Sequence, residues 1–281
     1  MLHAQPNTFK GVITNMTGQP ASTWGTACLS DQNTFPAYTE ILSDTAYDTF
    51  GIMISLNGGL YSAEARDYLV NIGIDHNGDT DYNDCTIPNL LATNCGNLLN
   101  TGVWYYFPLY IPAGSALAAS VSCSHATDRN VYVGVTLFGR PTRPEMVRAG
   151  SYVDSFGAVT AASDGTTITS GSTSEGAWTQ MGSTTTKPYW WWQSGWGAND
   201  SSLTAVLYGM DVAVGDATYK EIIYQDQLKT NAGTAEQSAQ SFLPNHCHVA
   251  EIAAGVLVYA RFQCSGSPDG ALSSIVYALG G

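Results

Sequence analysis

Residues 111–139 read IPAGSALAASVSCSHATDRNVYVGVTLFG, and residues 252–280 read IAAGVLVYARFQCSGSPDGALSSIVYALG. The two stretches align without a gap, and nine of the 29 aligned positions hold identical residues. Chance would give about two identities at ordinary residue frequencies. In the first stretch the shared residues are Ile111, Ala113, Gly114, Ala119, Cys123, Ser124, Asp128, Val135 and Gly139. The chain therefore contains two copies of one unit.

Three further pairs of segments, all upstream of these stretches, occur in the same order in both copies. They are AYTEILSDT with AWTQMGSTT (37–45 with 177–185), YLVNIGID with TAVLYGMD (68–75 with 204–211), and STWG with DSFG (22–25 with 154–157). Self-similarity in a fixed order predicts a tandem duplication of one domain. The predicted divisions are an N-terminal arm over 1–22, a first domain over 23–139, a linker over 140–150 and a second domain over 151–281.

The hydrophobic pattern inside each copy has a period of two residues, which is the period of a β-strand. Residues 117–123 and 256–264 alternate in this way, so each is predicted to be a half-buried strand with Cys123 and Cys264 on its apolar face. Further strands are predicted over 50–56, 68–75 and 131–138. Short strands and frequent turns predict an all-β chain of two tandem β-sandwich domains, with a jelly roll as the preferred topology.

The second copy contains a stretch rich in Ser, Thr and Gly that has no obvious match in the first copy. This stretch, DGTTITSGSTSEG, covers residues 164–176. Such a composition between two apolar segments is typical of a loop. We therefore expect an enlarged surface loop over these residues.

The charge of the chain narrows its possible partners. The formal net charge is −13, so nucleic acid and anionic membranes are poor partners. No apolar run approaches the about 20 residues that a membrane-spanning helix needs, and the opening MLHAQPNTFKGVITNMTGQPAS lacks an apolar signal core. We expect synthesis in a reducing cytoplasm, where the six cysteines stay mostly as thiols. Whether Cys85 and Cys95 pair to close a small loop is left open.

No catalytic motif is recognisable in the chain. Its five histidines accompany no G-x-S-x-G elbow or other nucleophile motif. Paired carboxylates for glycoside hydrolysis would meet only in space, so no particular pair is predicted. His246 and His248 could share one face of a strand and bind a metal jointly, but the spacing suggests no third ligand, and a loop is the favoured interpretation. We predict a protein without enzymatic activity.

The aromatic stretch PYWWWQSGWG, residues 188–197, is the strongest indication of ligand binding. An exposed indole offers a flat apolar face on which a sugar ring can stack. The duplication places residues 190–192 where residues 50–52 lie, at the start of a strand, so alternation buries at least one face of the run. Trp191 and Trp196 are predicted to be the most exposed and are the glycan or interface candidates. Burial in the core or at a subunit interface is the favoured alternative.

The stretch IDHNGDTDYND, residues 74–84, resembles a calcium loop in part of its pattern. Its oxygen-bearing side chains stand at alternate positions, and the candidate calcium ligands are Asp75, Asn77, Asp79 and Asp81. Thr80 stands where the calcium-loop pattern needs glycine, and Thr86 stands where it needs a bidentate glutamate. The full pattern is therefore incomplete.

The same residues also suit a hairpin. Asn77-Gly78 is a frequent centre of a type I′ turn, which needs positive φ at both residues. Aligned with MDVAVGDATYKE (210–221), the stretch keeps Asp75 opposite Asp211 and Gly78-Asp79 opposite Gly215-Asp216, but Asn77 faces Val214 and Asp81 faces Thr218, so the full ligand set is lost. We favour a hairpin at the edge of a sandwich. Otherwise we expect no cofactor, and calcium is kept as a candidate stabiliser of this loop in the first copy.

The segment YLVNIGIDHNG, followed by FPLYIPAGSALAASVSCS and VYVGVTLFG, resembles a domain of virion structural proteins from tailed bacteriophages. These are head-decoration, head-fibre and tail-associated proteins. The resemblance covers residues 37–139, and it reaches the second copy only through the alignment of the two copies. It implies a non-enzymatic β-sandwich protein built into a virus particle, often as a trimer.

The resemblance favours capsid decoration, in which the chain acts as a cement protein on the head. The implied partners are the major capsid protein or other virion proteins, and the implied location is the virion, after synthesis in the bacterial host cytoplasm. Two alternatives stay open. One is a tail or head fibre that recognises surface glycans through Trp191 and Trp196, and the other is a glycan-degrading β-sandwich enzyme.

Overall fold

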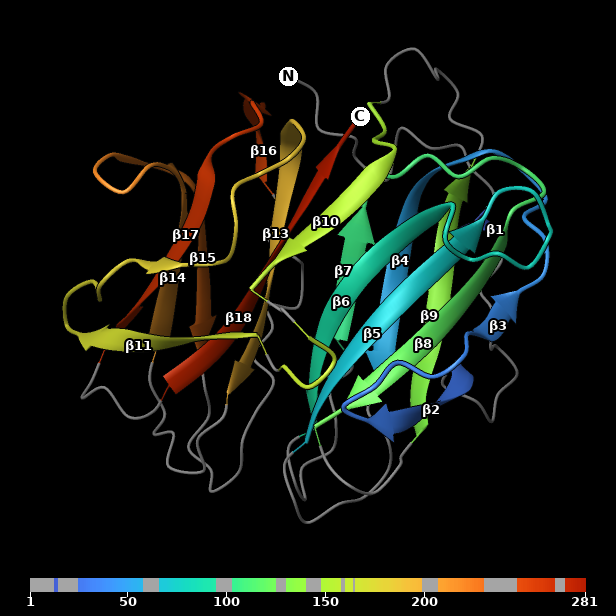
Figure 1. Cartoon of the computed structure of the whole chain (residues 1–281), viewed down its shortest axis with the longest axis horizontal. Coiled ribbons are helices and arrows are strands. Elements are labelled where there is room, and N and C mark those ends of the chain that lie inside the picture. The colour runs from blue at the N-terminus through green and yellow to red at the C-terminus, as the bar shows by residue number, and fades with distance from the viewer. Residues whose placement is uncertain are drawn as a thin grey trace.

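The computed structural model contains two β-sandwiches that lie side by side (Figure 1). It describes residues 13–14, 25–57, 66–94, 103–124, 130–139, 148–157, 160–163, 165–198, 207–229, 247–265 and 271–281. Every regular element among these residues is a β-strand, as the period of two residues predicts. No helix in this part of the chain is long and apolar enough to cross a membrane.

The first sandwich is built from β1 to β9. One sheet contains β1 (Ile13–Thr14), β2 (Thr26–Gln32), β9 (Asn130–Gly139), β4 (Thr49–Asn57) and β7 (Val103–Phe107). The other sheet contains β3 (Thr39–Leu42), β8 (Ala116–Cys123), β5 (Arg66–Asp75) and β6 (Cys85–Asn94). Strand β2 joins both sheets, because residues 26–29 pair with β9 and residues 30–32 pair with β8.

The second sandwich repeats this plan from β10 to β18. One sheet contains β10 (Tyr152–Phe156), β11 (Thr166–Ser172), β18 (Ala271–Gly280), β13 (Tyr189–Ala198) and β16 (Cys247–Ile252). The other sheet contains β12 (Thr179–Gln180), β17 (Leu257–Cys264), β14 (Leu207–Gly215) and β15 (Lys220–Lys229). Strand β11 joins both sheets as β2 does, because residues 166–169 pair with β18 and residues 170–172 pair with β17.

The strand orders confirm the predicted fold class. The orders are β6-β5-β8-β2-β9-β4-β7 and β15-β14-β17-β11-β18-β13-β16, so each label in the second order is nine higher than its counterpart in the first. Each sheet alternates early and late strands of its own copy, which is the jelly-roll arrangement of two Greek keys. The division into arm, linker and independently folding domains stays a prediction.

Strand pairing also corrects the register of the duplication. Tyr68 pairs with Cys123, and Tyr208 pairs with Cys264. Because the two cysteines are equivalent, Tyr208 is the counterpart of Tyr68, and the predicted match of 68–75 with 204–211 is four residues out of register. A shift by an even number of residues preserves the alternation of apolar side chains, so the hydrophobic pattern could not detect the error.

The predicted match of residues 22–25 with residues 154–157 is wrong as well. Gly25 stands directly before β2, and its counterpart directly before β11 is Gly165. A Cβ on Gly25 would lie 2.7 Å from the backbone of Val133, and a Cβ on Gly165 would lie 2.7 Å from the carbonyl oxygen of Ser274. Their φ angles are +134° and +98°. Both positions therefore require glycine for the close approach of equivalent strands.

The predicted loop over residues 164–176 is largely a strand, since β11 occupies residues 166–172. Three of the first four residues of β11 are threonine and the other is Ile168. All four are β-branched, and β-branched side chains favour strands. Ile168 is fully buried in the core of the second sandwich. The threonine-rich composition concealed a strand with one deeply buried anchor.

The two cores confirm the placement of the repeated cysteines, because Cys123 lies in the core of the first sandwich and Cys264 in that of the second. Strand β8, however, is buried on both faces and not on one as predicted. Tyr38 and Tyr82 pack over its outward alanines. The hydroxyl of Ser120, also on the outward face, donates a hydrogen bond to the carbonyl oxygen of Pro36.

Candidate functional site

Strand β13 carries the tryptophan run, and the structure buries it. Trp190 and Trp192 are 0% exposed, and Trp191 and Trp196 are each 3% exposed. The Trp196 ring packs edge-on against Phe262 in the core of the second sandwich. The prediction that Trp191 and Trp196 are exposed is therefore wrong, and neither indole offers a face to a sugar.

The physical reason is that β13 and its neighbour β18 lie between two apolar layers. In β18 the side chains of Leu272, Val276 and Ala278 belong to the core of the second sandwich. The intervening side chains belong to a cluster that is continuous with the core of the first sandwich. We call this set the junction, and its members from the second copy are Val153, Trp190, Trp191, Ile275, Tyr277 and Leu279.

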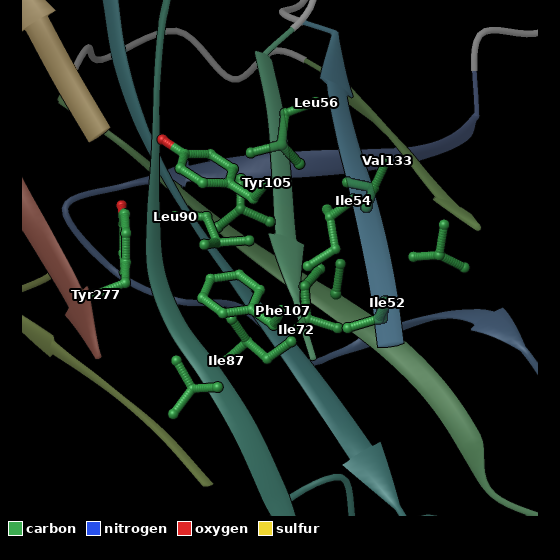
Figure 2. Close-up of a cluster of buried hydrophobic side chains, with 14 of the residues drawn as sticks. Ile52, Ile54, Leu56, Ile72, Ile87, Leu90, Tyr105, Phe107, Val133 and Tyr277 are labelled. Carbon is green, nitrogen blue, oxygen red and sulfur yellow. The ribbon is translucent and has the colours of Figure 1, made fainter. Parts of the chain in front are cut away.

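Tyr277 is the central side chain of the junction. Its hydroxyl donates to the carbonyl oxygen of Asn89 at 2.8 Å and accepts from the backbone N–H of Leu91 at 2.9 Å. Its ring meets Tyr105 and Phe107 edge-on, at centroid distances of 5.3 and 6.1 Å. Figure 2 shows Tyr277 on the side of the second sandwich, beside the side chains of the first. Burial raises its pKa well above the ordinary value, so the phenol stays protonated.

Other polar contacts hold the same two surfaces together. The side-chain amide of Asn89 donates to the hydroxyl of Ser155 at 2.9 Å. The hydroxyl of Ser122 donates to the carbonyl oxygen of Ala161, so the loop after β10 lies against β8. These hydrogen bonds give partners to polar groups at the contact. Without partners, burial of these groups would cost the free energy of their desolvation.

Arg148 covers the margin of the junction. Its guanidinium lies 4.2 Å from the centre of the Trp190 ring and donates to the carboxylate of Glu251 at 2.9 Å. Such a stacked cation stabilises an aromatic ring by about 0.5–1 kcal/mol at an exposed site. Arg148 therefore packs as part of the structure and is not held ready for a free anion.

The acidic loop between β5 and β6 is organised around Asp75. This carboxylate is fully buried and accepts the backbone N–H groups of Asn77, Gly78 and Thr80 at 2.7–2.8 Å. Desolvation by burial alone would raise the pKa of Asp75, but these three hydrogen bonds together hold it below its ordinary value. Both of its oxygens are therefore occupied in holding the loop.

The other candidate calcium ligands also stabilise turns. Asp79 accepts the N–H of Asp81 at 3.0 Å, and Asp81 accepts the N–H of Asn83 at 3.2 Å. Within the described ranges, no three His, Cys, Asp or Glu side chains gather where they could hold a metal ion. A hydrogen-bonded loop accounts for the geometry, and a calcium ion at Asp75, Asn77, Asp79 and Asp81 stays a prediction.

The hairpin is formed as expected, because β5 and β6 pair antiparallel on either side of the loop. Its turn type is not the predicted one: positive φ occurs at Gly78 and Thr80, and Asn77 does not have it. The counterpart of Asp75 is Gly215, because Asp75 pairs with Ala116 and Gly215 pairs with the equivalent Leu257. The expected equivalence of Asp75 and Asp211 is therefore wrong.

A charged cluster lies on the outer face of the second sandwich. Arg261 donates to Asp211 at 2.7 Å and also pairs with Glu175. Its guanidinium lies 4.2 Å from the centre of the Trp178 ring. One face of this half-buried indole is therefore covered, and the cation is already neutralised by two carboxylates.

The buried thiols of Cys28 and Cys85 are poor nucleophiles. Burial raises the pKa of Cys28 to about 12 and that of Cys85 to about 11, so neither forms a thiolate at neutral pH. Cys85 is a free thiol 3.7 Å from the carbonyl oxygen of Ser151, and Cys95 lies outside the described residues. His246 also lies outside them, and His248 falls in β16.

No family model matches the chain, and no curated protein matches it. Three solved structures illustrate its similarities. They are a cryo-EM structure of Broad Bean Stain Virus (7% identity, 97% of this chain and 90% of that chain, TM-score 0.39), the STIV MCP (9%, 91% and 96%, 0.33), and the CBM22-1-CBM22-2 tandem domain of Paenibacillus barcinonensis Xyn10C (9%, 96% and 94%, 0.27). At these TM-scores the similarities assign neither a family nor an activity.

Proposed function

We propose that the chain is a non-enzymatic structural protein of a bacteriophage virion, and that it decorates and cements the head. The observation that carries the proposal is the junction. It joins the two jelly rolls through one continuous and closely packed apolar cluster. Jelly rolls are a common architecture of viral capsid proteins. The resemblance of residues 37–139 to virion proteins of tailed phages points in the same direction.

The proposed partners are the major capsid protein or other virion proteins, together with further copies of the chain as a trimer. The chain would be made in the host cytoplasm and located in the virion. Protonated buried thiols such as Cys28 and Cys85 suit synthesis in that reducing compartment. The net charge of −13 keeps the free protein soluble until it meets its particle.

Particles that lack the protein provide the test. Purified chain added to such particles should bind until a fixed number of sites is filled, and bound particles should withstand heating or chelation longer than bare particles. Imaging of the intact virion would then locate the chain on the head. Binding that never saturates, or saturating binding without any gain in particle stability, would contradict a cement role.

The fibre alternative loses the residues on which it depended. Trp191 and Trp196 are buried, so a glycan-binding role would need another exposed aromatic side chain. Trp178 is only half-buried, but the Arg261 guanidinium occupies one of its faces. A glycan array probed with the purified chain separates the two roles, since decoration predicts no binding to bacterial surface glycans.

A further inference from the structure

The face of the second sandwich that forms the junction has an equivalent in the first sandwich. Gln193 pairs with Tyr277 in the second copy, and Met53 pairs with Thr136 at the same position in the first. The residues around Tyr277 are buried against the first sandwich. Met53 and Thr136 are only partly buried. The same sheet face is thus covered in one copy and turned outward in the other.

This outward face, which we call the head face, carries no charged side chain on its three strands. It is formed by β4, β7 and β9, and these three strands contain no Lys, Arg, Asp or Glu. Trp104 on β7 is 42% exposed, and Leu29 on the adjoining β2 is 56% exposed. In a chain with a net charge of −13, an uncharged face is a place where two copies can meet without like-charge repulsion.

The surface that receives the junction also has an equivalent. In the first sandwich Leu69 pairs with both Leu91 and Ser122 at the edge formed by β5, β6 and β8. Leu91 and Ser122 hydrogen-bond to the second copy. All three residues are at most 2% exposed, so this edge is covered by the second sandwich.

In the second sandwich no residue that the structure describes covers the site of Gly209 on the equivalent edge, which we call the tail edge. Gly209 takes the place of Leu69 and pairs with Gln227 and Gln263. A Cβ on Gly209 would meet nothing within 4 Å. Gln263 is exposed, and the neighbouring Leu207 is 45% exposed. Each chain therefore has one surface equivalent to the face that forms the junction, and one surface equivalent to the edge that receives it.

We propose that copies of this chain associate head to tail, with the head face of one copy seated on the tail edge of the next. The occupant of the head face is a second copy, because the equivalent face of the second sandwich is seated on the equivalent of the tail edge within the chain. At the β7 margin of the head face, Tyr106 already meets Trp191 of the same chain, at a centroid distance of 5.8 Å. When two different surfaces of identical copies bind each other, the copies form a closed ring if the rotation between neighbouring copies returns to the first copy. A ring of three copies would contain six sandwiches and would agree with the trimer proposed above.

Two arginine substitutions test the pairing of these surfaces. Thr136→Arg blocks the head face, and Gly209→Arg blocks the tail edge, where the open space lets the isolated chain tolerate a side chain. Thr34→Arg, at an exposed position outside the strands that form the two surfaces, is the matched control. Melting curves that match the unaltered protein show that each variant is folded.

Sedimentation velocity over a concentration series provides the readout. The unaltered chain and Thr34→Arg should form oligomers, and each blocked variant alone should lose them and sediment as a monomer. An equimolar mixture of Thr136→Arg and Gly209→Arg should form a dimer and nothing larger, because one free head face meets one free tail edge. A monomeric unaltered chain, or blocked variants that still assemble, would overturn the proposal.

A mixture that stays monomeric would also overturn it, since the free tail edge of Thr136→Arg and the free head face of Gly209→Arg together make one complete head-to-tail contact. Particles are absent from these measurements. Failure here therefore leaves the particle-binding test of the cement role unaffected.

Discussion

Strands β9 and β18 occupy the same position in the two sandwiches and differ in what covers their outer faces. In β9 the outward residues Tyr132, Thr136 and Phe138 are only partly buried. In β18 the equivalent outward positions include Tyr277 and Leu279, which are 0% exposed. The topology of the two copies is the same, so the difference lies in the outward side chains and in what packs against them.

This difference shows how a duplicated domain gains a new role without a new fold. The inner faces of both strands supply ordinary core residues. The outer face of β18 has acquired long apolar side chains that bind its neighbour, whereas β9 keeps a smaller residue, Thr136, at the position of Tyr277. The outer face of β18 therefore holds the two sandwiches together, whereas the outer face of β9 is turned outward.

Truncation of the two equivalent side chains, Tyr277 in β18 and Thr136 in β9, tests this difference most directly. Tyr277→Ala should lower the free energy of unfolding by about 3–5 kcal/mol, because it removes a fully buried aromatic ring and leaves two backbone groups without their partner. Thr136→Ala should change it by no more than about 0.5 kcal/mol. Urea denaturation of both variants measures the difference. Similar losses of unfolding free energy at both positions would show that the junction does not stabilise the fold more than the outward face of β9 does.

The next largest effect is expected at Gly195, where the backbone of the second sandwich lies close to Tyr105 of the first. A Cβ on Gly195 would lie 2.5 Å from the hydroxyl oxygen of Tyr105. Gly195→Ala should therefore cost about 1–3 kcal/mol by overpacking. The first copy has Ser55 at this position, where no second sandwich lies above it. Gly209→Ala, where space is open, is the matched control and should leave the stability nearly unchanged.

The two aspartates that hold equivalent loops provide a smaller contrast. Asp216 accepts two backbone N–H groups, from Thr218 and Tyr219, whereas Asp75 accepts three and is fully buried. Hydrogen bonding lowers the pKa of Asp216, as it does that of Asp75 against the opposing effect of burial. A carboxyl with a lowered folded-state pKa stabilises the fold above its unfolded pKa of about 3.9. This contribution disappears as the pH falls through the folded pKa.

Asp75→Asn should therefore destabilise the protein at neutral pH more than Asp216→Asn does. Both differences from the unaltered chain should shrink on acidification below about pH 4. Thermal melting of the three proteins between neutral and acidic pH measures this. A loss at Asp75→Asn that is the same at every pH would show that the charge of the carboxylate is not what holds the loop.

The fold class was predictable because its signals are local. Alternation over residues 117–123 and 256–264, together with the gapless repeat, predicted strands and a duplicated sandwich before any contact was known. The register between distant segments was less accessible. A strand that slips by four residues keeps its pattern, so the match of Tyr68 with Tyr208 required the observed pairing.

The junction could not be predicted from alternation for a related reason. Alternation assigns one buried and one exposed face to a strand, and this rule placed Trp191 on the surface. The sequence did contain a signal in SIVYALG (274–280), which is apolar without alternation, as expected of a strand covered on both faces. What covers the second face depends on how the two sandwiches dock, and that is a property of the whole chain.

The smallest expected effect concerns calcium, and here the two copies provide their own control. Asp75 uses both carboxylate oxygens for backbone N–H groups, and Asp79 and Asp81 each accept the N–H two residues ahead. A bound ion would have to compete with these hydrogen bonds. A ligand stabilises a fold only to the extent that it binds the folded state. The melting temperature should therefore not change with a chelator or with added calcium.

The loop after β14 has no calcium-like pattern, so Asp216→Asn should behave as the unaltered chain does in this experiment. A melting temperature that rises with calcium in the unaltered chain, and no longer rises in Asp79→Asn, would establish an ion in the first copy. In that case the acidic loop would be a second feature, beside the outward face of β9, that distinguishes the two copies by function and not by fold.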